Sequence, residues 1–207
     1  MSKGLGVVGI GTDVGKTVVS AILAEALEAI YFKPIQAGDL NNSDRLKIQR
    51  WCSSNVQTLE EVYKLENAMA PHAAAELEGI RLDLDAIRFE KQNKTMLLEG
   101  AGGILVPLND KHTLLDIYKK SGFPVVLISR NYLGSINHTL MTLEILKSHQ
   151  IPVLGIIYTG EPSIHTESII EKISGLKKIG ELQFPNEINQ GFIKEQSEKF
   201  LFLAQKL

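Results

Sequence analysis

The sequence has few of the residues that build disulfides, thiolate metal sites or membrane spans. Cys52 is the single cysteine among 207 residues, which excludes an internal disulfide and a cysteine-rich metal site. No apolar run approaches the ~18 residues of a membrane-spanning helix. The short apolar run at 5–10 has neither a basic leader nor a cleavage site. We therefore expect a cytoplasmic protein without a membrane partner.

An excess of charge of either sign is also missing. The net charge is −2, and the 22 lysines and arginines are scattered along the chain rather than gathered in blocks. A nucleic-acid interface needs a concentrated basic surface, so we expect no nucleic-acid partner. The chain has 44% hydrophobic residues and shows neither internal repeats nor low-complexity segments. This composition predicts a single domain over residues 1–207 with a substantial core.

Strand-like and helix-like segments alternate along the chain. Runs rich in valine, isoleucine and leucine predict buried strands at 5–10, 30–35, 95–98, 124–129 and 152–158, with a weaker one at 178–182. Helix-like segments lie at 18–29, 43–52, 84–91, 113–121, 136–150 and 165–174. The alternation predicts an α/β fold with a mostly parallel sheet and helices on both faces. The tail, 186–207, is expected to pack helically over the sheet.

The clearest chemical signal is the glycine-rich segment GIGTDVGKT at 9–17, between the first strand and the first helix. In a P-loop NTPase fold, backbone N–H groups of such a turn surround phosphate oxygens. Lys16 would serve the β- and γ-phosphates and Thr17 would serve Mg²⁺. Ile10 stands where the first glycine of the usual spacing belongs, so the loop is one residue longer or reshaped. The alternative is a chance glycine-rich turn.

Three further residues suggest a metal and phosphate site. An apolar strand ends at Glu99, where a carboxylate would face the same crevice as the loop and hold Mg²⁺ directly or through water. Lys33 lies at the end of the second strand and would act as a second cation near the terminal phosphate. Asp44 stands at a helix start, where it would either cap the helix or bind the metal. The alternatives are an exposed acid in a turn for Glu99 and a surface lysine for Lys33. In the functional interpretation, Lys16 and Lys33 are solvent-facing cations in the crevice.

Together these segments resemble the dethiobiotin synthetases, ATP-dependent enzymes of biotin synthesis. The resemblance rests on GTDVGKT at 11–17, FKPIQAG at 32–38, NSD at 42–44, APH at 70–72, LEGAGG at 98–103 and LGSINHTLMT at 133–142. It implies a ligase that uses Mg²⁺ and ATP to convert 7,8-diaminopelargonate (7,8-diaminononanoate) and CO₂ or bicarbonate into dethiobiotin, ADP and phosphate. The implied intermediates are a carbamate and a carbamic–phosphoric anhydride. It also implies a homodimer with the substrate site at the interface.

The resemblance assigns roles to individual residues. Lys16 and Lys33 are the implied catalytic residues, and Thr17, Asp44 and Glu99 are the implied Mg²⁺ ligands. The implied nucleotide-binding residues are Thr12, Asp13, Val14, Gly15, Lys16, Thr17, Val18, Asp44, Glu99, Gly100, Ala101, Gly102, Thr159, Gln183, Phe184 and Pro185. The implied substrate-binding residues are Thr12, Lys33, Ala37, Gly134, Ser135, Ile136 and Asn137.

The helix start at 134–137 offers free N–H groups that suit a carboxylate. The alternative, which can coexist with that role, is simple capping of the helix by Ser135. Two positions depart from the family. Ala37 lacks the hydroxyl that members often carry there, and Gln36 is expected to compensate. Thr159 replaces the adenine-reading asparagine of the family, so we expect relaxed base selection.

Other P-loop proteins are the rival interpretations. ATPase switches of the partition or metal-insertion type carry a lysine early in the loop, where this chain has Gly11. Cobyrinate amidating synthases append a glutamine-amidotransferase domain with a nucleophilic cysteine, which Cys52 does not match. A passive nucleotide-binding module is the remaining alternative. ATP hydrolysis that depends on diaminopelargonate would separate the ligase from the switch and from the passive binder.

Overall fold

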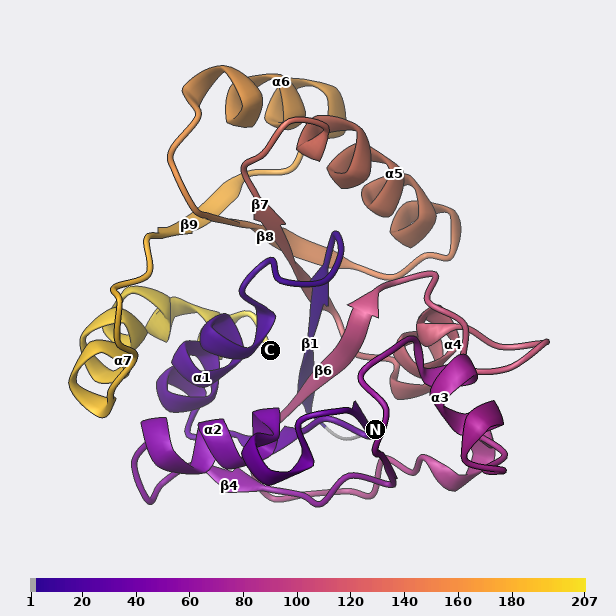
Figure 1. Ribbon diagram of the computed structural model, residues 1–207. Coiled ribbons are helices and arrows are strands. Elements are labelled where there is room, and N and C mark those ends of the chain that lie inside the picture. Colours follow the sequence, from indigo (N-terminus) through magenta and orange to yellow (C-terminus); the bar gives the residue numbers. More distant parts are fainter. Residues whose placement is uncertain (1–2) are drawn as a thin grey trace.

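The computed structural model describes residues 3–207 and centres on a parallel sheet (Figure 1). Its strands lie in the order β4, β2, β6, β1, β7, β8, β9, and every recorded pairing is parallel. Their bounds are β1 Gly4–Gly9, β2 Ile30–Phe32, β4 Gln57–Thr58, β6 Met96–Gly103, β7 Val125–Arg130, β8 Val153–Thr159 and β9 Lys178–Leu182. The predicted mostly parallel sheet is confirmed.

Helices cover both faces of this sheet. On one side α1 (Lys16–Leu27) contacts α2 (Asp44–Trp51) and α7 (Gln190–Ser197). On the other side α5 (Ser135–Ser148) contacts α6 (Ile164–Ser174), and α4 (Leu114–Ser121) packs against β6 (Figure 1). Short elements complete the chain: α3 (Pro71–Leu77) and the 3₁₀ segments η1 (Leu40–Asn42), η2 (Leu84–Ala86) and η3 (Glu198–Gln205). Within residues 3–207, no helix is long and apolar enough to cross a membrane.

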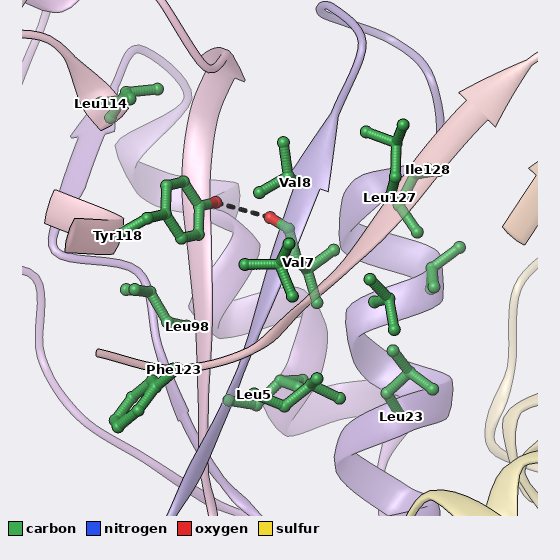
Figure 2. Packing of buried hydrophobic residues seen from close by; sticks show 14 of the residues in the cluster. Leu5, Val7, Val8, Leu23, Leu98, Leu114, Tyr118, Phe123, Leu127 and Ile128 are labelled. Carbon is green, nitrogen blue, oxygen red and sulfur yellow. Dashed lines mark hydrogen bonds between the residues drawn. The ribbon is translucent and has the colours of Figure 1, made fainter. Parts of the chain in front are cut away.

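Apolar residues of β1 form the centre of the core. Leu5, Val7 and Val8 are almost fully buried, with Leu23 of α1 on one side and Tyr118 of α4 on the other (Figure 2). The Tyr118 hydroxyl donates a hydrogen bond to the Val7 carbonyl oxygen at 2.6 Å. Because hydrophobic burial is the main favourable term in folding, this packing fixes β1, and with it the loop that follows.

Two secondary-structure predictions, at 30–35 and at 84–91, are wrong. The strand expected at 30–35 is interrupted after β2, because Pro34 has no N–H to donate to a sheet. The chain resumes as β3 (Ile35–Ala37), which pairs with β5 (Tyr63–Leu65) in a separate two-stranded sheet. The helix expected at 84–91 is only the short η2. There Ile87 is buried, and the Phe89 ring meets Phe32 and Phe123 edge to face, so tertiary packing prevails over helical spacing.

The C-terminal tail is helical, as expected. Both α7 and η3 pack against α1, which covers one face of the sheet. Phe200 of η3 is 1% exposed, and a Cβ atom built on Gly180 of β9 would lie 2.5 Å from its ring. The tail therefore packs mainly on α1 and reaches the sheet at its β9 edge.

Candidate active site

The loop between β1 and α1 is held in shape by backbone conformation and by its neighbours. Gly15 has φ 89°, and a Cβ atom there would lie 2.5 Å from the Phe184 ring. Only glycine suits such a position. Lys16 Nζ donates to the Gly11 carbonyl at 2.6 Å, and Thr159 Oγ1 donates to the Val14 carbonyl at 2.8 Å. The loop is thus tied both to its own lysine and to the end of β8.

A cluster of two carboxylates, a lysine and a hydroxyl lies beside this loop. Thr17 Oγ1 donates to Glu99 Oε1 at 3.1 Å. Lys33 Nζ lies 4.0 Å from Glu99 Oε1 and donates to Asp44 Oδ2. Lys33 thus bridges the two acids. Four groups from α1, α2, β6 and the turn after β2 converge at one end of the sheet, as expected for parallel strands.

Three expectations about this cluster are corrected by the structure. Lys16 and Lys33 are only 7% and 8% exposed, so they are buried cations rather than solvent-facing ones. Glu99 does not end its strand, because β6 continues to Gly103. Ser43 caps α2 by accepting a hydrogen bond from the Leu46 N–H, so the Asp44 side chain pairs with Lys33 instead of capping.

Burial sets the protonation of these groups. It lowers the pKa of Lys16 to about 8, although Glu99 opposes the shift. Burial raises the pKa of Glu99, and Lys33 only partly offsets it. Burial also acts to raise the pKa of Asp44, but Lys33 outweighs it and the net pKa is lowered. Asp44 therefore stays ionised easily, whereas Glu99 needs a nearby cation to do so.

The donor set fits Mg²⁺ when a nucleotide supplies further ligands. Thr17, Asp44 and Glu99 present only oxygen atoms, which is the chemistry that Mg²⁺ selects. In the described part of the chain, no group of three or more histidines, cysteines, aspartates and glutamates could hold a metal by itself. Phosphate oxygens and water would have to complete the coordination, as Mg²⁺ commonly requires.

A cavity of about 640 Å³ opens over the loop and the cluster. The predicted residues that line it are Thr12, Asp13, Gly15, Lys16, Thr17, Val18, Lys33, Asp44, Glu99, Gly102, Gln183 and Phe184. The predicted nucleotide residues outside its lining are Val14, Gly100, Ala101, Thr159 and Pro185. Thr159 is 1% exposed, and its hydroxyl donates a hydrogen bond to the Val14 carbonyl. Its side chain therefore stabilises the loop and does not face the cavity.

Five lining residues were missed from the sequence: Lys47, Trp51, Arg130, Gly160 and Glu161. Lys47 and Trp51 follow Asp44 by three and seven positions, a spacing that places all three on one face of α2. That signal was available in the sequence. The other three residues end β7 or follow β8, and only the assembled sheet brings them together.

A second cavity of about 650 Å³ lies between the start of the loop, residues 103–107 and α5. Thr12 lines both cavities, so they adjoin at the loop. The lining of the second is largely apolar and includes Ile104, Val106, Met141 and Ile145, with His138 and Glu144 at its polar side.

The remaining predicted substrate residues line neither cavity: Ala37, Gly134, Ser135, Ile136 and Asn137. Gly134 with φ 102° occupies the cap position of α5, and Ser135 is fully buried without capping the helix. Gln36 is outside both linings as well, and its amide donates to the Gly38 carbonyl at 2.9 Å.

Comparison with known proteins gives concordant results. A protein family described as an AAA domain matches residues 3–190. The ATP-dependent dethiobiotin synthetase BioD of Christiangramia forsetii is 46% identical over 201 residues, which cover 97% of each chain. The enzyme of the same name from Rhodopseudomonas palustris strain BisB5 is 42% identical over 177 residues, covering 85% of this chain and 84% of that one.

Solved structures show the same fold at low identity. The septum site-determining protein MinD of Pyrococcus horikoshii, complexed with Mg-ADP, superposes with a TM-score of 0.64 at 15% identity, covering 100% of this chain and 96% of that one. The cell division ATPase MinD of Pyrococcus furiosus gives 0.62 at 14% identity, covering 99% and 100%. At such identity the likeness concerns the fold alone, and it confirms the P-loop NTPase-type architecture.

Proposed function

Because the chain belongs to the family of ATP-dependent dethiobiotin synthetases, we propose that it carboxylates 7,8-diaminopelargonate and closes the ureido ring of dethiobiotin. ATP would be converted to ADP and phosphate in the same reaction. The observation that carries the proposal is 46% identity over 97% of both chains. It is supported by the convergence of Lys16, Lys33, Asp44 and Glu99 on one cavity.

The first cavity is the proposed nucleotide site. Backbone N–H groups of the loop and the start of α1 suit the phosphates, helped by the positive end of the helix dipole. Lys16 would move from the Gly11 carbonyl to a phosphate oxygen. Thr17, Asp44 and Glu99 would hold Mg²⁺, which supplies positive charge to the phosphates when bound.

The proposed chemistry needs positioning and charge rather than a protein nucleophile. One amine of the substrate takes up CO₂ and loses a proton to form a carbamate. A carbamate oxygen then attacks the γ-phosphorus, which breaks the bond to the β–γ bridging oxygen, releases ADP and gives a carbamic–phosphoric anhydride. The second amine then attacks the carbamoyl carbon, which closes the ring and releases phosphate. Lys16 and Lys33 would stabilise the negative charge that develops on the transferring group. Cys52 is unsuited to nucleophilic attack, because burial raises its pKa to about 12.

The second cavity is the proposed place for the aliphatic chain of the diamine. Its apolar lining by Ile104, Val106 and Met141 suits methylene groups, and Thr12 joins it to the phosphate side. Around this cavity Leu105 and Met141 are 50% and 57% exposed, and Leu133 before α5 is fully exposed. Burying these side chains would favour association with a second copy. We propose a homodimer in which the start of α5, residues 134–137, receives the substrate carboxylate of the partner's site.

The decisive experiment measures ATP hydrolysis with and without diaminopelargonate and bicarbonate, together with dethiobiotin formation. Hydrolysis that depends on the diamine and matches dethiobiotin formed mole for mole supports the ligase. Hydrolysis at the same rate without the diamine, and no dethiobiotin, would instead indicate a nucleotide switch.

A further inference from the structure

Tyr31 is buried directly beside Glu99, and the proposed chemistry gives it no role. It lies in β2 and is 0% exposed. In the register of the sheet Tyr31 is opposite Leu97 of β6, two residues before Glu99. Residues two apart in a strand point to the same face, which places the Tyr31 and Glu99 side chains together. The Tyr31 hydroxyl donates to Glu99 Oε2 at 2.9 Å.

The two oxygens of Glu99 therefore have different surroundings. Oε2 accepts the hydrogen bond from Tyr31, within the sheet. Oε1 accepts the hydrogen bond from Thr17 at 3.1 Å and lies 4.0 Å from Lys33 Nζ. Thr17 and Lys33 both line the nucleotide cavity, so Oε1 is the oxygen on the cavity side.

We propose that Tyr31 is a positioning residue: by holding Glu99 Oε2, it keeps Glu99 Oε1 directed to the cavity, where it would bind Mg²⁺. This inference rests on the proposed function, which makes Glu99 a metal ligand. Without the hydroxyl the carboxylate is freer to rotate about its last bond, away from the orientation in which Thr17 donates to Oε1. Groups that orient a metal ligand from behind typically affect metal affinity by roughly 10- to 100-fold.

The test uses Tyr31→Phe, which removes the donor and keeps the ring. The affinity for a non-hydrolysable ATP analogue is measured by calorimetry, once in excess Mg²⁺ and once in EDTA. The ratio of the two affinities is the metal-dependent gain. We expect Tyr31→Phe to lower this gain roughly tenfold or more. The affinity in EDTA should stay within about twofold of the wild type, because the loop and Lys16, which bind the phosphates without metal, are unchanged.

Tyr118→Phe is a matched control, because it also removes a buried tyrosine hydroxyl. Its hydrogen bond goes to the Val7 carbonyl oxygen rather than to Glu99 (Figure 2). We expect it to lower thermal stability and leave the metal-dependent gain unchanged. Tyr31→Met, which also lacks a donor but has a flexible side chain, should reproduce the loss seen with Tyr31→Phe and serves if that variant fails to fold.

Glu99→Gln identifies which proposal has failed. If Glu99→Gln lowers the gain while both Tyr31 variants keep it within twofold of the wild type, the role of Tyr31 is overturned and the ligase proposal stands. An equal loss in Tyr118→Phe also overturns it, because general loosening of the core would explain the effect. If Glu99→Gln leaves the gain unchanged, Glu99 is not a metal ligand, and both the metal assignment and the role of Tyr31 fall. Absence of dethiobiotin formation by the wild type would count against the proposed activity alone.

Discussion

At the scale of single residues, two buried lysines supply the positive charge of the site. Lys33 is compensated by Asp44 and Glu99, and Lys16 by the Gly11 carbonyl. A buried charge without such partners would lower the stability of the folded state. Removing Lys33 would therefore also leave the two carboxylates facing each other without their common cation.

Lys16→Ala and Lys33→Ala should each lower kcat by about 10²- to 10³-fold, the loss of roughly 3 to 4 kcal/mol of charge stabilisation. Steady-state turnover at saturating ATP and diaminopelargonate measures this. Lys172→Ala, an exposed lysine of α6 that lines neither cavity, is the control and should keep normal rates. A near-normal rate in Lys33→Ala would remove its catalytic assignment.

The choice of nucleotide base depends on the side chain at position 159. The Thr159 hydroxyl is engaged by the Val14 carbonyl, so it does not provide the donor and acceptor pair of an asparagine amide. Losing a bidentate pair removes roughly 1 to 3 kcal/mol of discrimination. GTP and CTP should then support ring closure within about one to two decades of ATP. Comparing kcat/KM for the three nucleotides decides this, and a preference for ATP above about a thousandfold would contradict it.

The sequence was sufficient to predict the position of residues that are placed by their immediate neighbours along the chain. Gly15, Lys16 and Thr17 follow a strand and open a helix, so their position needs no knowledge of distant contacts. Thr159 was misplaced because a hydroxyl can bond whichever carbonyl lies nearest, and that choice is made only when β8 meets the loop. Tyr31 gave no signal either, because its partner Glu99 is brought beside it by the pairing of β2 with β6.

At the scale of elements, α2 presents one side of the nucleotide cavity. Asp44, Lys47 and Trp51 all line it from one helical face. Lys47 Nζ lies 3.5 Å from Asp44 Oδ1, so Asp44 meets a lysine at each of its oxygens. Helical spacing alone predicted α2 closely, whereas the strand over 30–35 was wrong because Pro34 ends the pairing of β2.

Trp51 is the single tryptophan of the chain, so tryptophan fluorescence reports on the surroundings of α2 alone. Binding of a Mg²⁺-bound ATP analogue should change its fluorescence intensity or emission wavelength, because the ligand alters the polarity around the indole. The change should saturate with the same affinity that calorimetry gives. Trp51→Phe serves as the control for signals from the nucleotide itself. Unchanged emission at saturation would place α2 away from the bound nucleotide.

A charged network joins α6 to β9. Lys178 Nζ donates to Glu167 Oε2 at 2.6 Å and also to Glu181. Burial acts to lower the pKa of Lys178, but the bonds to both acids outweigh it and raise the pKa. Burial likewise acts to raise the pKa of Glu167, yet the bond from Lys178 and its other donors lower it. The lysine contribution is therefore present below its ordinary pKa of 10.5, and the glutamate contribution above its ordinary pKa of 4.5.

Lys178→Met should consequently lower the free energy of unfolding by about 1 kcal/mol at neutral pH. The difference from wild type should shrink as pH falls through the lowered pKa of Glu167, and again as it rises through the raised pKa of Lys178. Urea unfolding at several pH values measures it. Lys177→Met, at the neighbouring exposed position, should show no such pH-dependent difference. A deficit that stayed constant across this range would mean that packing, not charge, accounts for the effect.

At the scale of the whole molecule, the two cavities meet at the loop, where Thr12 lines both. The alternation of strands and helices predicted the sheet that creates this arrangement. It did not predict the contribution of α5 to the second cavity, because which face of α5 lines the cavity depends on how α5 packs against α6. The lining of a cavity made by distant segments follows from tertiary packing, which no local pattern contains.

The pairing of β1 with β6 has a consequence for how the molecule loses its activity. Val7 is opposite Glu99, and Gly9 is opposite Gly103, so the backbone of one ladder carries both the phosphate loop and the carboxylate. The most protected amides of a protein usually belong to such central strands. Local opening of α3 or the C-terminal tail would leave this ladder closed. Heat inactivation and global unfolding should then follow the same curve, with hydrogen exchange in β1 and β6 as the last to become fast.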